Sequence, residues 1–115
     1  MSTEHMSLAQ VESLATEALV GAGTSPESAK SVGKAAQAAE RDGIRSHGLL
    51  YVPIYCEHVK CGKVDGVAVP EVTRPRLSAI QVDAKTGFAH PAIDAGFNEL
   101  IPLVKSNGCA GLTIR

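Results

Sequence analysis

The stretch that decides the fold is ERDGIRSHG, residues 40–48, which places a serine, a histidine and a glycine just after the end of a predicted helix. Gly43 and Gly48 let the backbone approach a ligand closely on either side of the histidine. An imidazole with an ordinary pKa of about 6.5 can pass a proton at neutral pH. Ser46 is close enough in sequence to hydrogen-bond the imidazole or a substrate. His47 and Ser46 are therefore the predicted catalytic pair.

The residues that follow resemble the wall of a pocket. On a helix with about 100° per residue, imidazole and phenol groups gather within one sector: His47, Tyr51, Ile54, Tyr55 and His58. The opposite side is apolar and core-like: Leu49, Val52, Cys56 and Val59. Phenols and imidazoles combine an apolar body with a hydrogen-bonding tip, which suits a partly buried pocket wall. The same stripe is also typical of a protein interface, and that alternative stays open.

Local signals predict three helices in the first half of the chain. A capping-box pattern predicts a helix over residues 7–20. Serine followed by proline predicts the start of a second helix at residues 25–26, which ends near residues 42–43. The small residues on one face of this second helix let a neighbouring helix approach closely. A third helix is predicted from about Leu49 to Lys60.

The second half of the chain predicts a mixture of strand and helix. Residues 63–76 are rich in glycine and proline and are expected to form an extended connection. Alternating apolar residues predict a strand over 78–83, followed by a turn at 85–87. A fourth helix is expected over 91–105, and a strand begins at about residues 110–114.

Composition excludes several classes of function. The chain has 115 residues, a net charge of −1 and 3% aromatic residues, so no charged field or stacking platform favours nucleic acid or an anionic membrane. No apolar run approaches the ~18 residues that a membrane span needs. Three cysteines without a tight pattern indicate a reduced, cytoplasmic protein. Cys56 and Cys61 would point about 140° apart on a helix, so no metal site is predicted.

The run 40–48, followed by Pro53, Tyr55 and Gly62, closely resembles the malate/L-lactate dehydrogenase-like oxidoreductases. This type-2 family is distinct from the Rossmann-fold lactate and malate dehydrogenases. The resemblance covers nearly the whole chain. It implies an α/β fold of the family's own type, of which these would be the N-terminal helices plus strands, incomplete here. Residues 1–115 would then be the N-terminal part of a substrate and dimerisation domain, with the cofactor domain downstream.

The resemblance also implies a function. Members transfer a hydride between NADH or NADPH and a 2-oxo/2-hydroxy acid, or a related imino acid, and usually act as homodimers. The histidine matching His47 gives a proton to the substrate carbonyl or imine, the serine matching Ser46 relays it, and the tyrosine matching Tyr55 lines the site. NAD or NADP would be bound mainly by residues outside this chain.

One position departs from the family pattern. Many members carry an arginine where this chain has Tyr51, and that arginine would pair with a substrate carboxylate. A tyrosine donates only one hydrogen bond. Arg45 is a possible substitute, so Tyr55, Tyr51 and Arg45 are the candidate substrate-binding residues. His90 could face the same pocket, although a histidine in a turn is the simpler interpretation.

A second function stays open at this stage: a free-standing helical module whose histidine and tyrosine face binds a protein partner. The family chain is about three times this length, and the present chain stops on an apolar, strand-like run. These features predict a fragment that is inactive without the remainder of its own polypeptide. A coding frame that continues past Arg115 favours the enzyme, whereas a natural stop there favours the module.

Overall fold

A capping box begins the first helix. In the computed structural model, which describes residues 3–115, α1 spans Leu8–Gly21. The Ser7 hydroxyl accepts the backbone N–H of Gln10, and the Gln10 side chain accepts the backbone N–H of Ser7. These two bonds satisfy N–H groups that the first helical turn leaves unpaired. The helix therefore begins where the capping pattern predicts.

The second helix, α2, spans Pro26–Arg41 and packs closely against α1. Gly33 lies where the two helices approach each other. A Cβ atom at this position would collide with the Thr16 hydroxyl and lie 3.1 Å from the carbonyl oxygen of Glu12. The prediction that a neighbouring helix approaches this small-residue face is thus confirmed.

After α2 the chain forms two short 3-10 turns, η1 (Arg45–His47) and η2 (Leu49–Tyr51), and then the helix α3 (Val52–Lys60). The predicted third helix is confirmed, although its first turn is a 3-10 turn. The placement of His47 on that helix is wrong. Gly48, with φ −90° and ψ −142°, leaves helical geometry and separates His47 from the residues of α3.

The three helices form one lobe of the protein, and a three-stranded sheet belongs to the other. Its strands are β1 (Glu71–Arg76), β2 (Ala79–Asp83) and β3 (Gly111–Ile114), in the order β1-β2-β3. β1 pairs antiparallel with β2, and β3 pairs parallel with β2. The prediction of an extended connection over 63–76 is wrong for its last six residues, which form β1. β1 is an edge strand with mostly exposed side chains and a proline at position 75, so it carries no clear apolar alternation.

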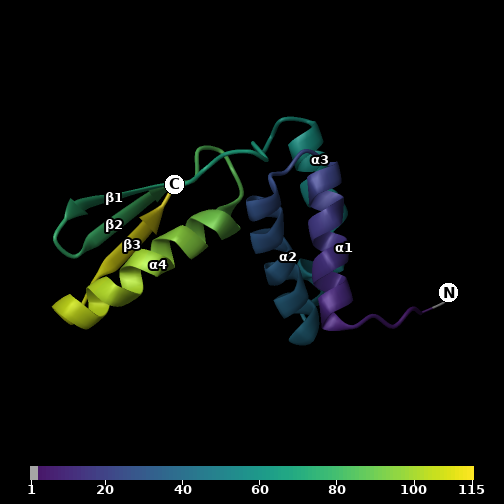
Figure 1. The fold of residues 1–115 in the computed structure, drawn as a ribbon, viewed down its shortest axis with the longest axis horizontal. Coiled ribbons are helices and arrows are strands. Elements are labelled where there is room, and N and C mark those ends of the chain that lie inside the picture. Colours follow the sequence, from purple (N-terminus) through teal and green to yellow (C-terminus); the bar gives the residue numbers. More distant parts are fainter. Residues whose placement is uncertain (1–2) are drawn as a thin grey trace.

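The helix α4 (Ala89–Asn107) carries the chain from β2 to β3 and covers one face of the sheet (Figure 1). Ile80 and Val82 of β2 are buried in the core beneath it. The predicted strand at the end of the chain is confirmed as β3. It pairs with β2, and its Leu112 side chain packs against α4 at Gly96.

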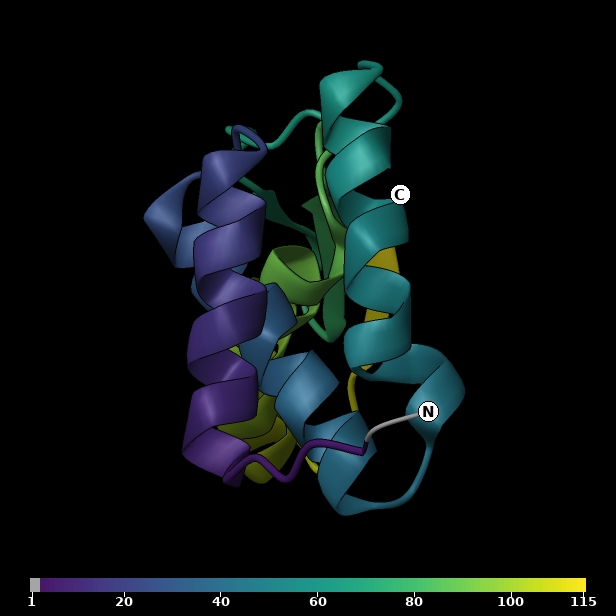
Figure 2. The same cartoon turned by 90° about the vertical axis from the view of Figure 1, so that its right-hand side faces the viewer.

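The two lobes each have their own core. One core lies among α1, α2 and α3, and the other lies between α4 and the sheet. Figure 2 looks from the helical side and shows α1 and α3 as the near layer, with the sheet lobe behind. Phe88, just before α4, is buried in the helical core and so joins the lobes. No helix within residues 3–115 combines the length and the apolar character that crossing a membrane requires.

The contact at Gly33 predicts a stability difference. Replacing Gly33 with Ala should lower the free energy of unfolding by about 1–3 kcal/mol, because the added methyl group collides with α1. Gly21→Ala is the matched control, since nothing lies within 4 Å of a Cβ there and alanine favours helix. Urea unfolding measures both variants. Equal stability of the two variants would contradict the close helix contact.

Candidate functional site

Ser46 and His47 form a hydrogen-bonded pair on η1. The Ser46 hydroxyl oxygen lies 2.9 Å from Nδ1 of the His47 ring, and both residues are exposed. When the hydroxyl donates to Nδ1, the neutral ring carries its proton on Nε2. That N–H is then the one available to a substrate. The geometry therefore suits a proton donor whose tautomer the serine holds.

The turn that carries this pair is tied to the end of α2. The backbone N–H of Ile44 donates to the carbonyl of Ala39 at 2.8 Å, which continues the chain directly from the helix. On the far side of His47, the backbone N–H of Leu49 donates to Oε1 of Glu40 at 2.8 Å. Both ends of the Ser-His-Gly segment are thus held by residues of one helical turn.

The two predicted tyrosines contact each other on the next turns of the chain. The rings of Tyr51 and Tyr55 are 4.8 Å apart between centroids and meet edge to face. Tyr55 also contacts Phe88 at 5.5 Å and His90 at 6.0 Å, again edge to face. Burial, and to a smaller extent Tyr51, raises the pKa of the Tyr55 hydroxyl. Tyr55 therefore stays protonated at neutral pH, and its hydroxyl can donate a hydrogen bond.

His90 joins this aromatic group, although the sequence favoured a simple turn histidine. It is the second residue of α4 and is half-buried against Tyr55. Its Nδ1 atom is buried and has no hydrogen-bond partner among the described residues. Burial lowers the pKa of His90, and the Asp94 carboxylate opposes this effect. The signal that could have found it is its position beside Phe88, a lone aromatic residue at a helix start.

The structure brings the candidates together in two groups. Ser46 pairs with His47, whereas Tyr51 and Tyr55 belong to the aromatic group with His90. The predicted common helical face of His47 and the tyrosines does not form, because Gly48 interrupts it. Arg45 is exposed at the start of η1 and makes no ion pair with another described residue. No ion-pair partner within residues 3–115 therefore fixes where the Arg45 guanidinium points.

A cleft of about 590 Å³ lies between α2 and α4. The Ser31 hydroxyl of α2 donates to the Asp94 carboxylate of α4 at 2.5 Å within it. Its other lining residues are Lys34, Ala35, His90, Ile93, Phe97 and Asn98, and none of residues 45–55 is among them. Among residues 3–115, no group of three histidine, cysteine or acidic side chains is arranged to hold a metal ion.

The family model for malate/L-lactate dehydrogenase matches residues 6–115. The chain belongs to this family. The resemblance carried by residues 40–48 is therefore confirmed. The α/β fold class is confirmed too, since the helices and strands match the N-terminal part of solved structures of the family.

Two relatives illustrate the range of this dehydrogenase family. The chain is 40% identical over 113 residues to a Δ1-pyrroline-2-carboxylate/Δ1-piperideine-2-carboxylate reductase of Pseudomonas syringae pv. tomato, covering 98% of the chain and 33% of the relative. It is 40% identical over 111 residues to a (2R)-3-sulfolactate dehydrogenase (NADP+) of Chromohalobacter salexigens, covering 95% of the chain and 32% of the relative. The chain thus spans about a third of the length of the curated relatives it matches.

Solved structures agree with this assignment. The crystal structure of Δ1-piperideine-2-carboxylate reductase from P. syringae superposes with a TM-score of 0.94 at 40% identity, covering 98% of this dehydrogenase-family chain and 34% of that chain. Malate dehydrogenase from Entamoeba histolytica superposes with a TM-score of 0.89 at 23% identity, covering 99% and 32%. The second match supports the fold alone.

His90 predicts a pH dependence of stability. Because burial lowers its pKa in the folded protein, the unfolded chain binds this proton more readily. The free energy of unfolding should therefore fall as the pH drops through about 6.5, the ordinary histidine value. His90→Gln should make this decrease shallower when unfolding is measured from about pH 8 to about pH 5.

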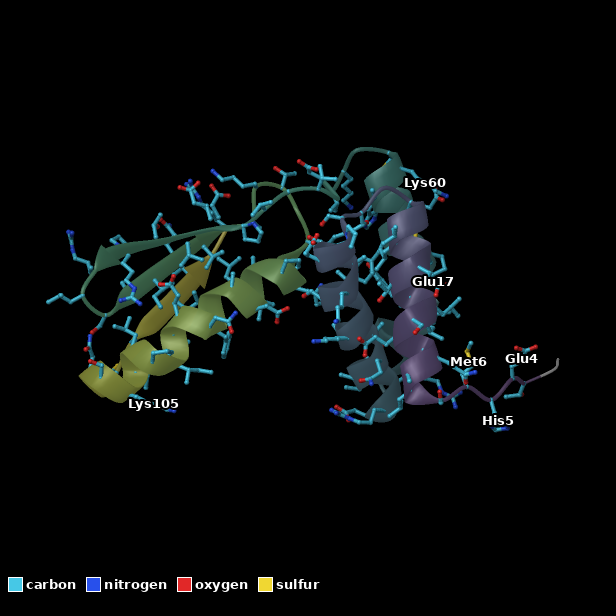
Figure 3. The ribbon with its side chains drawn as sticks, in the orientation of Figure 1. Glu4, His5, Met6, Glu17, Lys60 and Lys105 are labelled. Carbon is cyan, nitrogen blue, oxygen red and sulfur yellow. The ribbon has the colours of Figure 1, made fainter. Side chains whose placement is uncertain are left out.

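The control for this measurement is His5→Gln. His5 lies on the extended N-terminal segment, away from the helices (Figure 3), and is exposed. This variant should keep the wild-type pH dependence. If His90→Gln also kept it, the buried, neutral state of His90 would be wrong.

Proposed function

We propose that this chain is part of an oxidoreductase that reduces the C2 oxo or imino group of a small carboxylic acid with NADH or NADPH. His47 donates the proton to the C2 oxygen or nitrogen, and Ser46 holds the ring tautomer. The observation that carries this proposal is the 2.9 Å contact between the Ser46 hydroxyl and Nδ1 of His47, on an exposed turn of a chain of this family. The alternative, a free-standing interaction module, loses support from the family membership.

The substrate class that we favour is a cyclic imine with a carboxylate beside the imine carbon. The P. syringae relative is a reductase of Δ1-pyrroline-2-carboxylate and Δ1-piperideine-2-carboxylate. In this chain, Tyr51 and Tyr55 supply a continuous aromatic surface, which suits an apolar ring better than a small open-chain acid. Tyr55, held protonated by burial, can donate one hydrogen bond to such a substrate. Arg45 is the cation that we assign to the substrate carboxylate.

The nicotinamide cofactor supplies the hydride when bound. The sequence has no G-x-G-x-x-G run or phosphate-binding loop, the motifs that hold dinucleotides and nucleotides in other folds. We therefore propose that NAD or NADP is held by a cofactor domain downstream, and that residues 1–115 form the N-terminal part of the substrate and dimerisation domain. The three unpaired cysteines support a cytoplasmic setting.

The face of α4 that borders the cleft with α2 supports a further part of this proposal. Four large apolar side chains at helical spacing stay exposed in a stripe: Ile93, Phe97, Ile101 and Val104. Phe97 and Ile101, on successive turns, are 48% and 52% exposed, and contiguous exposed apolar side chains mark interaction surfaces, whereas single ones are ordinary. We propose that the remainder of the same polypeptide or the second subunit of a homodimer covers this stripe.

The proton-donor role predicts a large effect of one substitution. His47→Ala in the intact polypeptide should lower turnover by a factor of about 10² to 10⁴, because general acid catalysis is lost. Steady-state reduction is measured with Δ1-pyrroline-2-carboxylate, Δ1-piperideine-2-carboxylate, 3-sulfopyruvate and oxaloacetate, with each nicotinamide cofactor. The cyclic imines should give the highest kcat/KM.

His58→Ala is the matched control, since His58 is a half-buried histidine on α3 outside the hydrogen-bonded pair. It should keep turnover within about threefold of wild type. Turnover of His47→Ala within a few-fold of wild type would overturn the proton-donor role. A preference for an open-chain acid would overturn the cyclic imine alone.

The α4 stripe predicts an assembly defect. Phe97→Glu in the intact polypeptide should place a charge in a covered apolar surface. It should therefore lower the melting temperature by about 4 °C or more, or shift the protein from dimer to monomer. Differential scanning calorimetry and light scattering measure these effects. Ser106→Glu places the same carboxylate on an exposed position of α4 outside the stripe and the cleft, and should change neither. Equal behaviour of the two variants would contradict a covered stripe.

A further inference from the structure

A side-chain hydrogen bond joins the end of α2 to the start of η2. Glu40 lies in the last turn of α2, and its Oε1 atom accepts the backbone N–H of Leu49 at 2.8 Å, nine residues along the chain. Leu49 begins η2, where no side chain of the turn itself caps the backbone. The carboxylate of Glu40 is therefore what satisfies this N–H.

Gly48 is shaped around the same carboxylate. A Cβ atom at residue 48 would collide with Oε1, Cδ and Cγ of Glu40. Gly48 is also buried, whereas the three residues before it are exposed. A side chain at residue 48 would therefore displace the Glu40 carboxylate from its bond to Leu49.

The position of His47 depends on this contact. The His47 side chain is exposed, and its only hydrogen bond to a described side chain is the one to its neighbour Ser46. Within the turn, the backbone N–H of His47 donates to Ile44 and that of Gly48 donates to Arg45, at 3.0 and 3.2 Å. These short-range bonds hold the turn together but do not tie its downstream end to α2. The Glu40 bond does so, beside the packing of the Leu49 side chain against the helical core.

We infer that Glu40 is a positioning residue for His47: its carboxylate fixes the downstream end of the Ser-His-Gly turn and so sets where the imidazole stands. This inference rests on the proton-donor role of His47. The Glu40 carboxylate bonds the backbone of Leu49 and not the imidazole, which pairs with Ser46. It acts only through the backbone of residues 48 and 49, so an amide in place of the carboxylate should serve nearly as well.

The test compares three substitutions in the intact polypeptide. Glu40→Ala should lower kcat about 10- to 100-fold with little change in KM, because a displaced proton donor costs turnover more than binding. Glu40→Gln keeps an acceptor oxygen and should stay within about fivefold of wild type. Glu17→Ala removes an exposed glutamate of α1 (Figure 3) and should leave kcat unchanged. A Glu40→Gln enzyme as slow as Glu40→Ala would overturn the inference, since the charge and not the bond would then matter.

A double-mutant cycle tests whether the Glu40 carboxylate occupies the space that a side chain at residue 48 would need. Gly48→Ala alone should lower kcat about 10- to 100-fold, since its methyl group drives the carboxylate away. In the Glu40→Ala background, the same change should cost less than about threefold, because the space is then empty. Additive effects would contradict the packing of Glu40 against Gly48.

Amide hydrogen exchange gives a readout that does not depend on activity. The Leu49 amide should exchange at least about tenfold faster in Glu40→Ala than in wild type or Glu40→Gln. His47→Ala separates the two hypotheses. If His47→Ala abolishes turnover while Glu40→Ala leaves kcat and Leu49 exchange unchanged, the positioning role is wrong and the proposed function stands. If His47→Ala keeps turnover, the proposed function fails and the positioning role fails with it.

Discussion

The burial of Phe88 in the helical core is the contact on which the rest of the structure depends. This ring precedes α4, the helix that covers the sheet, yet it packs among α1, α2 and α3. It therefore joins the sheet lobe to the helices, together with the hydrogen bond between Ser31 of α2 and Asp94 of α4. Its ring meets that of Tyr55 edge to face, and His90, two residues further along, contacts the Tyr55 ring as well. Phe88 thus contributes both to the contact between the lobes and to half of the candidate site.

The other half of the site depends on a different support. Ser46 and His47 stand on an exposed turn that the end of α2 holds through Glu40. α2 is itself fixed by its close contact with α1 at Gly33. The Ser46–His47 pair and the aromatic group are therefore positioned by separate parts of one helical core.

Sequence reasoning found the elements whose signals are local. The capping pairs at Ser7 and Ser25 act within one turn, so the first two helices could be placed from the chain alone. β1 was missed because its pairing with β2, and not its own alternation, makes it a strand. The helical placement of His47 was wrong because Gly48 leaves helical geometry where it packs against the Glu40 carboxylate. This contact spans eight residues, and helical periodicity does not predict it. The contact of His90 with Tyr55 was missed as well, because the two residues are far apart in the sequence and meet only in the folded chain.

Tyr51 gives the departure from the family pattern a structural meaning. Its ring meets Tyr55 edge to face at 4.8 Å, so this position contributes to packing of the aromatic group. The arginine that the family resemblance implies for this position would supply a carboxylate clamp, whereas the tyrosine adds to the aromatic surface. In the proposed enzyme the cation must then come from η1, where Arg45 stands exposed two residues before the proton donor and without an ion-pair partner among the described residues. Recognition of the carboxylate and delivery of the proton would in that case share one short turn, and the tyrosines would hold the body of the substrate against it.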